Sequence, residues 1–185
     1  MIAATPLRPL LRSRLAQRIK HRIVEMPAAL VPEVLGTLEK AGVQAWLAGG
    51  WGVDALLGEQ TRPHQDLDLV FDADHDGERR AIGALEALGF QVMGREPVKA
   101  LWWSERIALS DDRGHVVDLH PVSGADFQAA LRAHSENPFV TGTVAGRTVS
   151  CLGPSIQLRL HEGYDDATEA DRADVELLRG EVGGG

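Results

Sequence analysis

The stretch Gln65-Asp66-Leu67-Asp68-Leu69-Val70-Phe71 decides the expected fold, because acidic and apolar residues alternate along it. Successive side chains of a β-strand point to opposite faces, so Asp66 and Asp68 share one face of the expected strand. Aspartate is disfavoured in strands, and two aspartates on one face, about 7 Å apart, repel each other. Mg²⁺, which prefers one or two carboxylates together with substrate phosphates, would offset this repulsion. The alternative is an exposed edge strand with solvated acids.

A second strand of the same kind, His115-Val-Val-Asp-Leu-His120, adds a third acid. Its alternation places Asp118 and His120 on one face. Three carboxylates on two neighbouring strands could hold two metal ions about 3.5–4 Å apart, which clamp the attacking and leaving oxygens of a phosphoryl displacement. Asp118 could also accept the proton of an attacking hydroxyl. His120 fits equally well as a partner of a metal ligand and as a hydrogen-bonded structural residue.

The pair Gly49-Gly50 precedes the first acid strand and is expected to form a turn at the start of a helix. Glycines let backbone N–H groups approach a phosphate closely, and the positive end of the helix would point to the same place. A plain tight turn is the alternative. Asp54 would fall in the first turn of this helix, where an acid satisfies the helix dipole better than it serves as a ligand.

The remaining pattern mixes strands with helices and predicts an α/β (α+β) domain with one mixed sheet flanked by helices. The expected strands are 43–47, 67–71, 90–94, 102–110, 115–120, 141–144 and 147–152, and the expected helices are 8–24, 28–41, 51–57, 76–88, 154–162 and 168–179. We therefore divide the chain into a basic N-terminal helical extension, residues 1–26, and one catalytic domain with C-terminal helices, residues 27–185.

Composition and charge narrow the class of protein. The chain has 185 residues and one cysteine, Cys151, which excludes an internal disulfide and favours a reducing, cytoplasmic setting. No apolar stretch approaches the roughly 20 residues needed to span a bilayer. Residues 1–22 contain six basic and no acidic residues, and the whole chain has a net charge of −8, so residues 23–185 carry −14. An acidic body suits a cationic small substrate better than nucleic acid.

The run from Ala48-Gly-Gly-Trp-Gly-Val-Asp to Asp-Leu-Asp-Leu-Val70, followed by Val117-Asp-Leu-His-Pro121, resembles the antibiotic-inactivating nucleotidyltransferases. The similarity is to the aminoglycoside 2''-adenylyltransferase and lincosamide nucleotidyltransferase group of the DNA polymerase β-like superfamily. Its signature is a glycine turn, an Asp-x-Asp strand and a third acid on a later strand. The resemblance covers roughly residues 40–180 and implies the nucleotidyltransferase fold.

The resemblance also implies the roles of the matching residues. Asp66, Asp68 and Asp118 would be the catalytic residues and the ligands of two Mg²⁺ ions. Gly49 and Gly50 would cradle the triphosphate. Arg62 and His64, in the loop before the first acid strand, are further candidates for nucleotide binding.

The implied reaction transfers a nucleoside monophosphate from ATP or another NTP to a hydroxyl group of a small molecule. The expected nucleoside monophosphate is AMP. The expected acceptor is an aminoglycoside or a lincosamide antibiotic. Two alternatives stay open: a toxin-like nucleotidyltransferase acting on tRNA or protein, which the basic N-terminal residues would suit, and a non-catalytic nucleotide-binding module. Loss of a metal ligand would mark the last, and all three acids are present.

Overall fold

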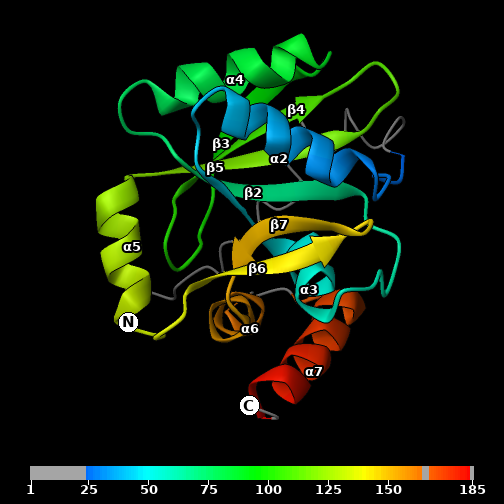
Figure 1. Cartoon of the computed structure of the whole chain (residues 1–185), viewed down its shortest axis with the longest axis vertical. Coiled ribbons are helices and arrows are strands. Elements are labelled where there is room, and N and C mark those ends of the chain that lie inside the picture. Colours follow the sequence, from blue (N-terminus) through cyan, green and yellow to red (C-terminus); the bar gives the residue numbers. More distant parts are fainter. Residues whose placement is uncertain (1–23, 164–166, 184–185) are drawn as a thin grey trace, which may run out of the picture.

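The computed structural model describes residues 24–163 and 167–183, and in them a mixed sheet of seven strands is flanked by helices (Figure 1). The strands are β1 (Ala45–Leu47), β2 (Asp66–Asp72), β3 (Gln91–Pro97), β4 (Glu105–Ser110), β5 (Val116–Val122), β6 (Phe139–Val144) and β7 (Arg147–Leu152). The helices are α2 (Leu30–Lys40), α3 (Gly49–Leu57), α4 (Gly77–Ala87), α5 (Gly124–Arg132), α6 (Pro154–Glu162) and α7 (Glu169–Gly183). The predicted fold class is confirmed. All but one residue of the predicted helix 8–24 lies outside the described residues.

The strand order, β3-β4-β5-β2-β1-β7-β6, brings the two acid strands together at the centre of the sheet. Strands β2 and β5 are parallel neighbours, and their register sets Asp68 beside Asp118 and Leu69 beside Leu119. Strand β4 pairs antiparallel with β5 on its other side. Alternation in both strands therefore turns the acids to one face and the leucines to the other.

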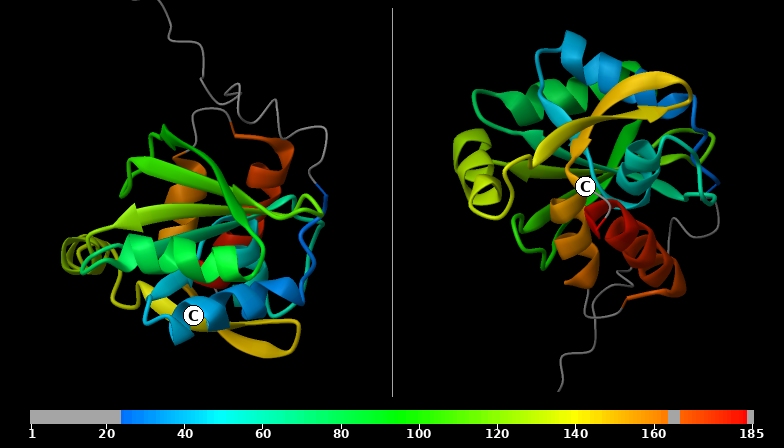
Figure 2. Two further views of the ribbon diagram at one scale, coloured as in Figure 1. Left: turned by 90° about the horizontal axis from the view of Figure 1, so that it is seen from above. Right: turned by 60° about the horizontal axis from the view of Figure 1, so that its bottom comes forward.

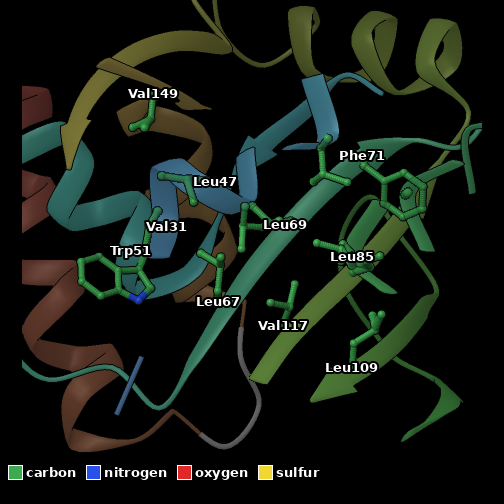
Figure 3. Packing of buried hydrophobic residues seen from close by; sticks show 14 of the residues in the cluster. Val31, Leu47, Trp51, Leu67, Leu69, Phe71, Leu85, Leu109, Val117 and Val149 are labelled. Atoms are coloured by element: carbon green, nitrogen blue, oxygen red, sulfur yellow. The ribbon is translucent and has the colours of Figure 1, made fainter. Parts of the chain in front are cut away.

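The leucine face of the sheet forms the larger hydrophobic core. Figure 3 shows Leu67, Leu69 and Phe71 following one another along β2, with Val117 of β5 beside them. Helices α2 and α4 cover this face and contact each other. Because this core takes up the apolar side of β2, the aspartates are left on the opposite face.

The acid face is covered only in part. A second cluster there packs Phe127 of α5 and Ile156 of α6 against Trp46 and Val70, beyond the acids. Helices α6 and α7 lie side by side and both contact α3, as Figure 2 shows in its right-hand view. None of the described helices is long and apolar enough to cross a membrane.

One expected element has the wrong bounds, and one helix was not predicted. The strand predicted at 102–110 begins only at Glu105. The two preceding tryptophans lie in the loop, and the ring of Trp103 packs 5.1 Å from that of His120. Helix α5 was not expected, although Phe127 and Leu131, four residues apart, are its buried contacts. The run is short and rich in alanine, so its helical pattern is weak.

Candidate active site

The three predicted acids meet on one face of the sheet at the β2–β5 pair. Asp68 and Asp118 are direct neighbours in the register, and Asp66 lies two residues earlier on β2. Solvent access decreases across the group: Asp66 is exposed, the Asp68 side chain is 30% exposed, and Asp118 is buried. On this face of the sheet, solvent therefore reaches Asp66 more readily than Asp118.

Crowding of the acids changes their proton affinities. Burial raises the pKa of Asp118 to about 6, although the Arg106 guanidinium acts in the opposite direction. Desolvation and the charges of Asp68 and Asp118 raise the pKa of Asp66 to about 8. Because the Asp66 side chain is exposed, repulsion between the carboxylates, rather than burial, is the main cause of its raised pKa. The raised pKa values mean that the protein alone stabilises the ionised forms of Asp66 and Asp118 poorly, and a bound cation would offset that cost.

Two basic side chains hold two of the acids. His120 places Nε2 at 3.1 Å from Oδ1 of Asp68, and this hydrogen bond lowers the pKa of Asp68 against the effect of burial. Arg106 of β4 donates from Nη1 to Oδ2 of Asp118 at 3.0 Å and from Nη2 to Glu96 of β3. Polar contacts therefore run from Glu96 on β3 through Arg106 to Asp118 on β5, and a separate contact joins His120 of β5 to Asp68 of β2.

The residues fit a divalent cation by their chemistry. The Oδ1 atom of Asp118 is buried and has no hydrogen-bond partner, which is costly for a carboxylate oxygen unless something binds it. Three carboxylates on one face supply the hard oxygen ligands that Mg²⁺ prefers. Within residues 24–163 and 167–183, no three acid, histidine or cysteine side chains already converge as a formed metal cluster.

The predicted glycine turn lies directly against the acids. Gly49 has φ +59°, and a Cβ added there would come closer than 3.0 Å to Oδ2 of Asp68. Helix α3 begins at this glycine, and no side chain caps its N-terminus. The first N–H groups of a helix lack intrahelical partners, so this end suits a phosphate.

The loop before β2 places the other two candidates at the same turn. A Cβ on Gly50 would come closer than 3.0 Å to both Arg62 Nη2 and His64 Nδ1. The His64 ring is buried and packs at a tilt of 43° against Trp51, with ring centroids 4.5 Å apart. Arg62 keeps a side-chain exposure of 29%, so it can reach a ligand more readily than His64.

The expectation for Asp54 is wrong. Helix α3 begins at Gly49, so Asp54 lies in its second turn, and its carboxylate is buried. Its Oδ1 accepts hydrogen bonds from the backbone N–H and the hydroxyl of Thr61, at 3.1 and 2.6 Å, and its Oδ2 bonds His64 Nε2. Asp54 thus fixes the loop that carries Arg62 and His64.

Gly49→Ala is expected to reduce turnover strongly, because the new methyl group would displace the Asp68 carboxylate. Gly58→Ala is the matched control: Gly58 also has a positive φ, +77°, but a Cβ there meets nothing within 4 Å. Both changes should cost about 1–2 kcal/mol of stability through backbone strain. Steady-state kinetics and denaturant unfolding separate the two effects. Equal turnover in the two variants would contradict the close role of Gly49.

The sequence patterns did not reveal Arg106, Glu96 or Asp174 as part of the site. Arg106 stands on the strand next to Asp118, and Asp174 is a buried carboxylate of α7 that binds Arg62. The sequence offered one signal for Arg106, a charged residue at the start of an otherwise apolar strand. None marked Glu96. Asp174 ends the run Asp171-Arg-Ala-Asp174, which resembles the tail of the same nucleotidyltransferase group, but the run assigned it no role in the site.

Comparisons with known proteins agree with this geometry. A family model described as aminoglycoside-2''-adenylyltransferase matches residues 30–178. A lincosamide resistance protein of Staphylococcus haemolyticus is 32% identical over 154 residues, which are 79% of this chain and 90% of that protein. A 2''-aminoglycoside nucleotidyltransferase of Escherichia coli is 32% identical over 125 residues, which are 66% of this chain and 65% of that protein.

Two solved structures share the fold. The lincomycin-bound crystal structure of lincosamide antibiotic adenylyltransferase LnuA superposes with a TM-score of 0.65 at 29% identity, covering 84% of this chain and 98% of that one. ANT(2")-Ia in complex with adenylyl-2"-tobramycin gives a TM-score of 0.62 at 20% identity, covering 85% of this chain and 90% of that one. At that identity the second likeness concerns the fold alone.

Proposed function

Since the chain belongs to the aminoglycoside-2''-adenylyltransferase family and is an antibiotic adenylyltransferase, we propose that it transfers AMP from ATP to a hydroxyl group of a lincosamide. The observation that carries the proposal is the register that sets Asp68 beside Asp118, next to the Gly49 turn. A lincosamide is favoured over an aminoglycoside because the chain spans 90% of the lincosamide resistance protein and 65% of the aminoglycoside enzyme.

The proposed site divides the work among named residues. Asp66, Asp68 and Asp118 would hold Mg²⁺, which would neutralise the acids and the triphosphate. The uncapped end of α3, with Gly49 and Gly50, would bind the phosphates. Arg62 would add a cationic contact with the phosphates. His64 would support this loop from its buried position against Trp51.

The proposed chemical step balances as a displacement at phosphorus. The acceptor hydroxyl oxygen forms a bond to the α-phosphorus, the bond from that phosphorus to the bridging oxygen breaks, and pyrophosphate leaves. Asp118 would take the hydroxyl proton on Oδ1, the oxygen that Arg106 does not hold, when Mg²⁺ is held by Asp66 and Asp68. In the metal-free protein, burial raises the pKa of Asp118 to about 6, so its carboxylate is more basic than an ordinary aspartate.

The alternatives receive less support. The part of the chain after residue 22 carries −14, which disfavours the phosphate contacts that tRNA binding needs. A non-catalytic module would not require three acids, of which one has an unpartnered buried oxygen. A cytoplasmic location, where ATP is supplied and the free Cys151 stays reduced, is part of the proposal.

The acceptor is tested by pyrophosphate release with Mg²⁺ and ATP in the presence of lincomycin, tobramycin or tRNA. We expect release with lincomycin, little with tobramycin and none with tRNA, and mass spectrometry should detect the adenylylated antibiotic. Omission of ATP and addition of EDTA are the controls. Release with tRNA alone would refute the small-molecule acceptor, and release with tobramycin alone would reassign it to the aminoglycosides.

A further inference from the structure

Asp174 is a buried carboxylate on a helix whose neighbouring positions are mostly exposed. It is 1% exposed, whereas Arg172, Ala173 and Glu176 of the same helix are exposed. An ionised carboxylate out of water costs free energy unless a cation and hydrogen bonds compensate it. Its position in α7 therefore requires a specific partner.

The hydrogen-bonding partner of Asp174 is Arg62, 112 residues earlier in the chain, and Nδ1 of the buried His161 lies 3.9 Å from Oδ2 of the same carboxylate. Nη2 of Arg62 donates to Oδ2 of Asp174 at 2.7 Å, and its Nε donates to Oδ1 at 3.3 Å. Two parallel hydrogen bonds between a guanidinium and a carboxylate fix the plane of the guanidinium as well as its position. Asp174 thus determines where the Arg62 side chain points.

Arg62 is held at the glycine turn from several sides. Its Nη2 lies so close to Gly50 that an added Cβ would clash with it. Asp54 binds Thr61 on one side of Arg62 and His64 on the other. The backbone N–H of Met26 donates to the His64 carbonyl at 2.8 Å. Among the described residues, Asp174 is the only one whose side chain hydrogen-bonds the Arg62 guanidinium.

We propose that Asp174 is a positioning residue that holds the Arg62 guanidinium against the Gly50 turn for contact with the nucleotide triphosphate, so that α7 forms part of the nucleotide site. The inference rests on the proposed function. Asp174 uses Nε and one N–H of Nη2, which leaves Nη1 for a phosphate oxygen; Nη1 makes only a long contact, 3.4 Å, with the Pro63 carbonyl.

Docking of α7 does not by itself require this acid. The helix already buries Leu178 completely, and it contacts both α3 and α6. Replacing a buried ion pair with apolar side chains is often neutral or stabilising, so an acid at a docking position is not explained by stability. Its two hydrogen bonds to a partly exposed arginine beside a phosphate-binding turn point to orientation instead.

The test is the binding of Mg²⁺ with a non-hydrolysable ATP analogue, measured by calorimetry without an antibiotic. Asp174→Asn keeps the shape of the side chain but removes the negative charge that pairs with the Arg62 guanidinium. This change should weaken nucleotide binding about tenfold. KM for ATP should rise by a similar factor, with little change in KM for the antibiotic. Glu176→Gln, which breaks an exposed pair with Arg179 on the same helix, is the matched control and should leave nucleotide affinity unchanged.

A double-mutant cycle separates orientation from other effects. If Asp174 acts through Arg62, Asp174→Asn should add nothing to the loss caused by Arg62→Gln. Asp174→Glu covers the case in which the asparagine variant does not fold: it keeps the charge, moves the carboxylate by one methylene, and should still raise KM for ATP.

Three results would overturn the inference. The first is additive losses of nucleotide affinity in the double-mutant cycle. The second is unchanged nucleotide affinity in Asp174→Asn despite a lower Tm. The third is tighter nucleotide binding in Asp174→Asn, which would mean that the acid competes with the nucleotide for Arg62. Wild-type protein that binds no nucleotide would refute the proposed function itself. Wild-type binding equal to that of the variants would refute only the role of Asp174.

Discussion

Asp68→Asn is expected to lower kcat by about a thousandfold or more while the fold stays intact. Asp68 is the central acid: it lies beside Asp118 in the register, and Gly49 packs against its carboxylate. Loss of a metal ligand removes several kcal/mol of charge stabilisation from the transition state, and 1.36 kcal/mol corresponds to a tenfold change in rate. An asparagine oxygen can still accept the hydrogen bond from His120, so the local structure should persist.

The corresponding change at Asp66 should show the same loss of turnover with a different effect on stability. The Asp66 carboxylate is exposed and is repelled by its two acidic neighbours. Removing its charge relieves this repulsion, so the unfolding midpoint of Asp66→Asn without metal should hold or rise. Asp76→Asn, an exposed aspartate in a surface pair with Arg79, is the control and should leave turnover unchanged.

Kinetics with ATP and lincomycin and thermal unfolding in EDTA together check both variants. Turnover within a few-fold of wild type in either variant would show that the acid does not serve catalysis. A marked fall in the midpoint of Asp66→Asn would instead show that the acid is structural.

The sequence predicted the central part of the fold because its signal was local. Alternation at period two determined which residues share a face in β2 and in β5. Because the leucine face must pack against the core, the acid face has to lie on the other side of the sheet. The glycine turn was equally local. Asp66, Asp68 and Asp118 were therefore placed on the right elements before any tertiary contact was known.

The contacts that hold these residues depend on pairs far apart in the chain, which a single sequence does not reveal. Arg62 and Asp174 are separated by 112 positions, and Asp174 looks like one acid among several on α7. Arg106 reaches Asp118 only because β4 and β5 are adjacent in the sheet. Strand order brings Arg106 to Asp118, whereas the packing of α7 against α3 and α6 brings Asp174 to Arg62, and periodicity determines neither contact. The roles of these residues in binding and catalysis stay predictions.

Arg106→Met is expected to destabilise the metal-free protein by about 2 kcal/mol or more. The change leaves Oδ2 of the buried Asp118 without its guanidinium partner and removes the cation next to Glu96. Breaking a buried ion pair from one side costs about 3–5 kcal/mol, and the 25% exposure of the Arg106 side chain reduces that figure. Arg95→Met is the matched control on β3, because Arg95 forms exposed pairs worth about 0–1 kcal/mol.

Denaturant unfolding with EDTA and then with Mg²⁺ measures this effect and its link to the proposed metal site. A cation bound by the acids would replace part of the lost guanidinium charge, so Mg²⁺ should restore more stability to Arg106→Met than to wild type. Turnover should nevertheless stay low, because Asp118 loses the contact that orients its carboxylate. A loss no greater than that of Arg95→Met would show that Asp118 does not depend on Arg106. An equal gain from Mg²⁺ in variant and wild type would show that the cation does not bind at these acids.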